Sequence, residues 1–427
     1  MPPNSPRRLA DDCFRSDADR LRHGEVLALI RRRLTAVVDS EEVALAHAVG
    51  RVLAADIPAP RDIPAYDNAA VDGYAFSSAD CGPAGASLPV ALRIAAGDRN
   101  VAPLPAASAA RIFTGAPMPP GADTVAMQED CAVGPGRTET VTIPPGLRPG
   151  ANRRRAGEDV AAGEAVATAG ARLRPQDIAA IASTGRAAVP VFARLRVGLV
   201  SAGNELRRPG EPLADGEVYD ANHFLLRALL AALPCDASDL GITPDTAADA
   251  QRLLGEAAGR LDVVITTGGA SQGEEDHMVA ALGALGRRHL WQIAVKPGRP
   301  MAFGQIGDTV VFGLPGNPVA AFVCFLLYVR PALILLGGGQ WHEPQRFALP
   351  AGFTIARKKT GRREFWRGWL EPGPDGRPLA RKFERDGSGL ISGLRRASGL
   401  IEAGEEVAAV APGDIVAFIP FSEFGIG

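Results

Sequence analysis

The spacing of hydrophobic and polar positions changes several times along the chain. From Asp17 to Val38, apolar side chains recur at helical spacing, with Ser16 or Asp17 as a candidate N-cap. Residues 55–150 carry short apolar stretches separated by turns rich in glycine and proline, which is typical of short strands and loops. Residues 157–173 continue this pattern, and residues 175–183 are expected to be helical. The first part of the chain therefore predicts a helix and a small β-rich domain.

Apolar strands and helices alternate beyond residue 194. Strands are expected at residues 196–201, 237–242, 262–267 and 309–314. Helices are expected at residues 222–233 with Asp220 as the cap, at 246–259, at 276–285 and from Pro318 onward. This alternation predicts a doubly wound parallel sheet, in which ligands bind beyond the carboxyl ends of the strands. From about Gln340 short alternating segments return, which predicts a small C-terminal β domain.

Length and charge narrow the class of protein. At 427 residues the chain is too long for one compact core, so roughly two to four domains are expected. A net charge of -2 argues against a nucleic-acid binder, which normally carries a strong basic excess. The longest apolar run, Val319–Val329, ends at Arg330-Pro331 and is shorter than the roughly 20 residues that cross a bilayer. No apolar signal core follows the first charges, and five scattered cysteines favour neither disulfides nor a zinc knuckle. These features predict a cytoplasmic protein without a membrane or nucleic-acid partner.

Glycine-rich segments follow two of the expected strands. Thr266–Asp276 joins a strand to a helix, and its glycines allow backbone N–H groups to close around a phosphate or a pterin edge. Asp276 suits either a divalent ion or the helix dipole, and a plain Gly-Gly turn is an equal alternative. Gly313–Pro318 makes a similar connection, with Pro318 at the first helical position.

Two further segments carry candidate chemistry. Lys296 and Arg299 flank a Pro-Gly turn, where both can point at one oxyanion, although a solvated turn is the alternative. The chain holds only 4 lysines against 42 arginines, which makes this pair more informative than most. Asp67 and Asp72 lie five apart on a loop, an arrangement that suits Mg²⁺ or a pair of Asx turns. Gly157–Asp159 is equally ambiguous, and the six isolated histidines are assigned no metal.

Seven motifs taken together resemble those of one family in the same order. They are Asp67–Ala75, Arg111–Pro119, Arg155–Asp159, Ser201–Leu206, Asp262–Ser271, Lys296–Pro300 and Gly313–Pro318. From about residue 20 to residue 420 the chain resembles the bacterial molybdopterin molybdenumtransferase family (MoeA), which is related to the E domain of gephyrin.

The resemblance implies an elongated four-domain fold of α/β and β domains that forms a homodimer. An N-terminal helix with a returning linker would comprise residues 1–57 and 153–193, with a β-rich domain inserted at 58–152. An α/β domain like the molybdopterin adenylyltransferase MogA would span 194–340, and a C-terminal β barrel 341–427. The active cleft would lie between the α/β domain of one subunit and parts of the other.

The resemblance also implies a reaction and its residues. The family inserts molybdate into adenylylated molybdopterin with release of AMP, using Mg²⁺. The catalytic positions map to Asp67, Thr114, Asp159, Glu205, Asp245 and Asp276, of which Asp245 and Asp276 are expected to hold the metal. The pterin and adenylate positions map to Thr266, Gly268, Gly269, Ser271, Pro315, Gly316, Asn317 and Pro318. The molybdate positions map to Lys296, Arg299, Pro300, Arg367 and Ser388.

Two positions depart from the family pattern. Gln292 stands where a basic residue is common, and Arg299 stands where lysine is common. Three rival functions remain: an adenylyltransferase of the same pathway, a scaffold that only binds partners, and a sensor that binds ligand without turnover. Contacts with a molybdopterin adenylyltransferase and with acceptor molybdoenzymes are further expectations that follow from the resemblance.

Overall fold

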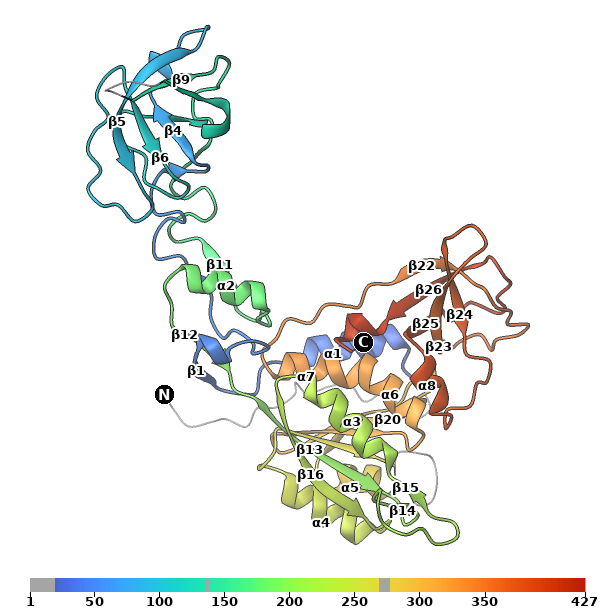
Figure 1. Ribbon diagram of the computed structural model, residues 1–427. Coiled ribbons are helices and arrows are strands. Elements are labelled where there is room, and N and C mark those ends of the chain that lie inside the picture. Colours follow the sequence, from blue (N-terminus) through green and yellow to red (C-terminus); the bar gives the residue numbers. More distant parts are fainter. Residues whose placement is uncertain (1–19, 135–138, 269–276, 427) are drawn as a thin grey trace.

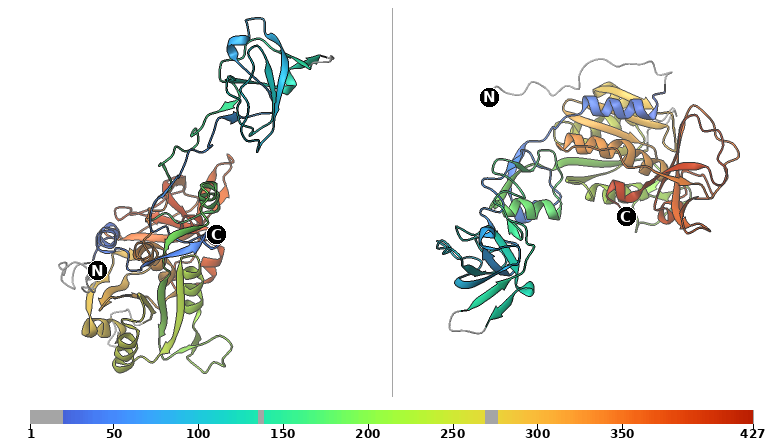
Figure 2. Two further views of the ribbon diagram at one scale, coloured as in Figure 1. Left: turned by 90° about the vertical axis from the view of Figure 1, so that its left-hand side faces the viewer. Right: turned by 90° about the horizontal axis from the view of Figure 1, so that it is seen from above.

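The chain folds into an elongated molecule with a β-rich domain at one end (Figure 1). The computed structural model describes residues 20–134, 139–268 and 277–426. Two larger bodies, an α/β domain and a C-terminal β domain, lie side by side at the other end (Figures 1 and 2). A narrow connecting region separates these bodies from the β-rich domain. The expected multidomain α/β plus β architecture is therefore confirmed.

The α/β domain is built on a six-stranded sheet with the order β16-β13-β17-β21-β20-β18. Its parallel part consists of β16 (Cys235–Thr243), β13 (Leu195–Ala202), β17 (Val263–Thr267) and β21 (Thr309–Leu314). These four are the strands that the sequence predicts. Two antiparallel strands extend the sheet, β20 (Pro300–Ile306) and β18 (Arg287–Gln292). The sequence analysis did not predict them, because β18 mixes charged and apolar residues without a strand-like run.

Helices cover both faces of this sheet. On one side lie α4 (Ala247–Ala257) and α5 (His277–Leu285). On the other lie α3 (Ala221–Ala231), α1 (His23–Arg33) and a long apolar helix. Asp220 caps α3, as predicted, since its carboxylate accepts a hydrogen bond of 3.0 Å from the His223 N–H. The helix expected from Asp17 to Val38 is shorter than predicted: within the described residues it spans α1 only, because Leu34 is already extended.

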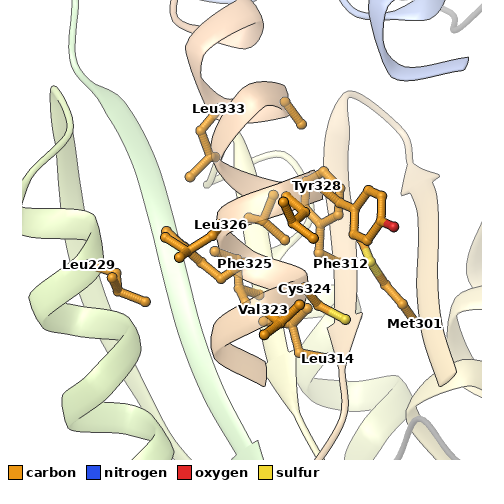
Figure 3. Packing of buried hydrophobic residues seen from close by; sticks show 14 of the residues in the cluster. Leu229, Met301, Phe312, Leu314, Val323, Cys324, Phe325, Leu326, Tyr328 and Leu333 are labelled. Atoms are coloured by element: carbon orange, nitrogen blue, oxygen red, sulfur yellow. The ribbon is translucent and has the colours of Figure 1, made fainter. Parts of the chain in front are cut away.

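The long helix runs from Pro318 to Leu336 and forms the centre of the core. It consists of α6 (Pro318–Cys324), a π-helical turn η4 (Phe325–Val329) and α7 (Arg330–Leu336). The helix continues past Arg330-Pro331, where the apolar run of the sequence ends, because a wider π turn precedes Pro331, which has no N–H to donate. The helix is long and apolar enough to cross a membrane, but 83% of it is buried inside the protein. Figure 3 shows its side chains, including Phe325 and Tyr328, packed against the sheet.

The β-rich domain contains a second six-stranded sheet, with the order β7-β4-β6-β5-β9-β8. Its strands are β4 (Gly73–Phe76), β5 (Ala86–Ile94), β6 (Ala109–Ile112), β7 (Thr124–Met127), β8 (Ala132–Gly134) and β9 (Thr140–Ile143). Short antiparallel pairs connect it to the rest of the molecule. They are β1 (Ser40–Ala44) with β12 (Ala188–Phe192), β2 (Ile57–Pro58) with β11 (Ala165–Ala167), and β3 (Asn68–Ala69) with β10 (Arg153–Arg154). The predicted helix of this region is α2 (Pro175–Ser183).

The C-terminal domain is a curled sheet with the order β19-β23-β25-β26-β22, and β24 pairs with β23. Its strands are β22 (Phe347–Pro350), β23 (Arg363–Pro372), β24 (Pro378–Lys382), β25 (Gly399–Ala403) and β26 (Ile415–Pro420). A bridge between Ala351 and Ala380 brings the two ends of the sheet together, as in a barrel. Strand β19 (Val295–Lys296) comes from the α/β domain and pairs in parallel with β23. The turn that carries Lys296 is therefore fixed to both domains.

Candidate active site

A cleft of about 540 Å³ lies where the α/β domain meets the C-terminal domain. Eight basic side chains and one acidic side chain line it. The basic residues are Arg20, Arg22, Lys296, Arg299, Lys359, Arg362, Arg367 and Lys382. The acidic residue is Asp386. Because like charges gather in a confined space, the cleft is suited to an anionic ligand.

The Lys296 turn is held rigidly at one wall of this cleft. Lys296 pairs with Glu364 in the β19–β23 ladder, and the Ile293 N–H donates to the Arg299 carbonyl at 3.0 Å. Gly298 adopts a positive φ of 107°, and a Cβ there would lie 2.3 Å from the Cys324 sulfur. Only glycine allows this close approach of the turn to the long helix. The turn thus presents Lys296 and Arg299 from a fixed backbone.

A buried carboxylate orients two of the cations. The Lys296 ammonium lies 3.8 Å from the Glu364 carboxylate, and 40% of the Lys296 side chain is exposed. Glu364 also accepts hydrogen bonds from the Arg362 guanidinium at 2.9 Å and from the Trp366 indole at 3.0 Å. Because Glu364 is fixed by these donors, it restricts where the Lys296 ammonium can go.

Arg367 and Ser388 form the opposite wall. The Arg367 guanidinium donates to the carbonyls of Leu390, Arg385 and Gly387 at 2.7, 2.6 and 3.2 Å. Burial lowers the pKa of Arg367 from its ordinary value. The Ser388 carbonyl accepts from the Val319 N–H at 3.0 Å, which ties this loop to the start of the long helix. Arg367 therefore shapes the loop that carries Ser388.

The glycine-rich strand ends adjoin the cleft, since Pro315 and Asn317 line it. The Asn222 amide donates to the Thr267 hydroxyl at 2.8 Å and to the Gly316 carbonyl at 2.7 Å, which locks the ends of β17 and β21 together. Pro300, at the start of β20, also lines the cleft, and Pro318 begins the helix behind it.

The neighbouring backbone leaves no room for a side chain at position 268, just after β17. Gly268 has a φ of +83°, and a Cβ there would lie 2.2 Å from the Ala202 carbonyl oxygen. The buried Thr266 hydroxyl has no hydrogen-bond partner in the described part of the chain. Gly269, Ser271 and Asp276 lie outside the described residues.

Two of the predicted carboxylates lie at neighbouring strand ends. The Asp245 N–H donates to the Asn204 side chain at 3.2 Å, which brings the loop of Glu205 alongside Asp245. Carboxylate oxygens are the ligands that Mg²⁺ prefers, and one or two from the protein suffice. Within residues 20–134, 139–268 and 277–426, no three acidic, histidine or cysteine side chains gather into a metal site. The described residues by themselves therefore do not form a complete metal site.

Asp67 precedes β3, Thr114 follows β6 of the β-rich domain, and Asp159 lies between β10 and β11. None of the three lines the cleft. The Asp67 carboxylate accepts from the Ala156 N–H at 2.8 Å and pairs with Arg153 at 2.5 Å. Thr114 donates to Asp72 through its N–H at 2.8 Å and its hydroxyl at 2.7 Å, and these bonds lower the pKa of Asp72. Asp159 is exposed. Within one chain these residues do not reach the cleft.

Five basic residues of the cleft were not predicted from the sequence. Arg20, Arg22, Lys359, Arg362 and Lys382 were not assigned to any site. The rarity of lysine in the sequence could have pointed to Lys359 and Lys382, because three of the four lysines in the chain line this cleft. For the arginines, which are spread over the whole chain, no signal distinguished those of the cleft.

Known proteins match the chain along most of its length. Residues 21–185 match the family described as "MoeA N-terminal region (domain I and II)", residues 198–334 "Probable molybdopterin binding domain", and residues 351–421 "MoeA C-terminal region (domain IV)". A molybdopterin molybdenumtransferase of Haemophilus influenzae is 38% identical over 384 residues, which cover 90% of this chain and 94% of that protein. Molybdopterin molybdenumtransferase 2 of Mycobacterium tuberculosis is 34% identical over 383 residues, 87% of this chain and 92% of that protein. The crystal structure of the molybdopterin biosynthesis moeA protein from Pyrococcus horikoshii OT3 gives a TM-score of 0.80 at 30% identity, and the match covers 94% of this chain and 100% of that chain.

Proposed function

Because the chain belongs to the MoeA family of molybdopterin molybdenumtransferases, we propose that it completes molybdenum cofactor biosynthesis by inserting molybdate into adenylylated molybdopterin. The two dithiolene sulfurs bind molybdenum, and their protons leave with one oxide ligand as water. A water molecule attacks the pyrophosphate, which breaks into AMP and the phosphate of the pterin. The observation that carries this proposal is the cationic cleft, which adjoins glycine-rich strand ends suited to a pterin phosphate.

Charge neutralisation explains why such a reaction needs this cleft. The reaction brings an oxyanion next to a dithiolate and a pyrophosphate. At 4 Å two unit charges of the same sign repel by about 4 kcal/mol at an effective dielectric constant of 20. The excess of basic side chains in the cleft offsets this repulsion locally, although the whole chain carries a net charge of -2.

The residues of the cleft and of the strand ends have different proposed roles. Lys296 and Arg299 bind molybdate as cations, and Glu364 holds Lys296 in place. Ser388 and Pro300 close the pocket around the anion, and Arg367 fixes the Ser388 loop. The strand ends bind the pterin and the adenylate. Their proposed residues are Thr266, Gly268, Gly269, Ser271, Pro315, Gly316, Asn317 and Pro318.

We include Mg²⁺ in this proposal, held by Asp245 together with Asp276 and assisted by Glu205. When bound, the ion would neutralise charge on the phosphates of the substrate. The chain's own contribution is the placement of Glu205 and Asp245 at adjacent strand ends. An Asp245→Asn variant is expected to need more magnesium for the same rate of AMP release.

A homodimer is part of the proposal, because Asp67, Thr114 and Asp159 do not line the cleft of their own chain. A second subunit would bring them to it. We place the enzyme in the cytoplasm, where the adenylyltransferase that supplies the substrate and the molybdoenzymes that accept the product would contact it.

One incubation tests the proposed function and separates it from its rivals. Purified protein is mixed with adenylylated molybdopterin, molybdate and Mg²⁺, and AMP is measured over time. Molybdate-dependent AMP release is expected. A scaffold or a sensor would release none, and an adenylyltransferase would consume ATP and unadenylylated molybdopterin instead.

A further inference from the structure

The segment just before α1 lies against the Lys296 turn. A parallel bridge joins Leu21 to Ile293, and the Ala294 N–H donates to the Leu21 carbonyl at 2.8 Å. This pairing places the side chains of Arg20 and Arg22 on the wall of the cleft. The N-terminal segment is therefore a structural part of the candidate active site.

Gln292 holds two of the cleft's arginines. Its side-chain oxygen accepts a hydrogen bond of 3.3 Å from the Arg20 Nε and another of 3.3 Å from the Arg299 Nε. The two Nε atoms are thus at most twice that distance apart. Gln292 is buried, with 8% of its surface exposed, so its position is fixed by packing. A neutral amide draws two positive groups together without cancelling either charge.

The carboxylates of this region are engaged with other cations. Glu364 pairs with Lys296 and Arg362, and Asp386 pairs with Lys382. Among the described residues, the guanidinium of Arg20 has its hydrogen bond with neutral Gln292 and no ion pair. Within residues 20–134, 139–268 and 277–426, no carboxylate balances this charge, so the guanidinium is suited to an anionic ligand.

Anchoring the chain does not require the Arg20 side chain. The backbone pairing with Ile293 and Ala294 already holds the segment. In addition, the buried His23 ring forms a hydrogen bond of 2.8 Å with the Tyr328 hydroxyl. An arginine at this place is therefore explained better by its charge than by its packing.

We propose that Arg20 binds substrate in this cleft, where Gln292 holds it beside Arg299 so that both guanidinium groups contact one tetrahedral oxyanion. That anion is either molybdate or a phosphate of the adenylylated pterin, and the inference rests on the proposed function. Arg20 supplies the positive charge that position 292 lacks in this chain. Gln292 acts as the positioning residue.

Four variants and two probes test this role. Arg20→Ala removes the cation, Arg20→Lys keeps a cation, and the double variant Arg20→Ala/Gln292→Lys moves it to position 292. Arg31→Ala is the matched control, because Arg31 lies on α1 and stacks on Trp341 at 4.6 Å instead of lining the cleft. Dissociation constants are measured for molybdate alone and for AMP alone, and thermal unfolding is recorded for each variant.

Loss of a charge-assisted hydrogen bond should weaken one of the two probes about tenfold or more in Arg20→Ala. Weaker molybdate binding identifies molybdate as the anion, and weaker AMP binding identifies a substrate phosphate. Arg20→Lys or the double variant should recover most of the affinity, and Arg31→Ala should match the wild type.

Two outcomes overturn the proposal. One is unchanged affinity for both probes in Arg20→Ala. The other is a loss that neither charge-restoring variant recovers, which would indicate a purely structural role. If the wild type itself binds neither probe and releases no AMP, the proposed function fails as well. A fully active wild type with an unaffected Arg20→Ala variant removes only the role of Arg20.

Discussion

The cleft and the β-rich domain both carry charged motifs, but they balance those charges differently. In the cleft, eight basic side chains face one acidic side chain, so a ligand has to complete the balance. In the β-rich domain, Asp67 is paired with Arg153 and a backbone N–H, and Asp72 with Thr114. The first region is built to receive an anion, whereas these carboxylates already stabilise their own loops.

This difference separates two roles of charged residues, stabilising the local fold and binding a ligand, which sequence motifs alone do not distinguish. A charged residue whose partners are all internal holds the local fold, and its removal should first affect stability. A charged residue that lines the cleft and keeps part of its charged side chain exposed there should affect ligand binding instead. Variants in both regions of the molecule test this distinction.

Lys296→Ala should give the largest effect. Removing a preorganised charge from an anion site typically costs about 3 kcal/mol, or about 10²-fold in rate. We expect molybdate-dependent AMP release to fall by about that factor, while AMP binding stays near the wild-type value. Arg377→Ala removes an exposed cation of the C-terminal domain that does not line the cleft, and serves as the control. Equal loss of molybdate and AMP binding in Lys296→Ala would contradict the division of the site.

His23 should make the cleft region, and not the β-rich domain, sensitive to acid. Burial lowers the pKa of His23 to about 3 from an ordinary value of 6.5. Below about pH 6.5 the unfolded chain therefore binds a proton that the folded chain does not, and stability falls as the pH drops toward 3. Between about pH 7 and pH 4.5 the wild type should lose about 2 to 3 kcal/mol more than His23→Phe.

Calorimetry at the two pH values measures this difference. The exposed His47, changed to Gln, is the control and should behave as the wild type. Because the domains can unfold separately, the β-rich domain provides an internal reference. Parallel pH dependence in His23→Phe and the wild type would argue against a neutral His23.

Gly268→Ala should disturb the strand end without affecting the cationic wall. The added Cβ would meet the Ala202 carbonyl oxygen, and the positive φ is unfavourable for alanine. Backbone strain of this kind costs about 1 to 3 kcal/mol. AMP binding should weaken about tenfold while molybdate binding is retained. Gly283→Ala is the matched control, because a Cβ at this position in α5 meets no atom within 4 Å. A loss of molybdate binding equal to the loss of AMP binding would contradict this prediction.

Asp67→Ala should give the smallest change in the free energy of unfolding among these variants, and its role across the dimer is measured separately by AMP release. It removes the acceptor of the Ala156 N–H and the partner of Arg153, which should destabilise the β-rich domain by about 1 kcal/mol. Molybdate binding to the cleft should not change. Asp159→Ala, at an exposed position, should leave stability unchanged. Chemical denaturation followed by domain-specific fluorescence or calorimetry checks both, and an unaltered midpoint for Asp67→Ala would weaken the comparison.

Much of the fold could be predicted from periodic apolar segments. The strands of residues 196–201, 262–267 and 309–314 were found because they are continuous apolar runs, and α2 was found by its proline start. The antiparallel strands β18 and β20 were missed because their pairing depends on long-range contacts and not on local pattern. The continuation of the long helix past Pro331 was not predicted, because local sequence does not show that a π turn precedes the proline.

The candidate site was harder to predict. Lys296 and Gly313–Pro318 stood out by composition and spacing, and the structure brings them together at one cleft. Arg20 and Gln292 could not be linked, because they are 272 positions apart and one ordinary arginine among 42 carries no signal. The resemblance to the family supplied Arg367 and Ser388, but only the structure showed that Arg367 holds the Ser388 loop.

We propose that the cationic cleft of one subunit is completed by Asp159 of its partner. Mixing Lys296→Ala with Asp159→Ala, after subunit exchange, tests it most directly by the rate of AMP release. When equal amounts of the two variants exchange subunits at random, about half of the dimers contain one subunit of each. In such a mixed dimer of twofold symmetry one cleft carries both changes and the other carries neither, so about a quarter of all clefts should become active. Activity that rises to about this level on mixing is the predicted result. Activity that remains at the level of the separate variants, with exchange verified, would contradict the claim.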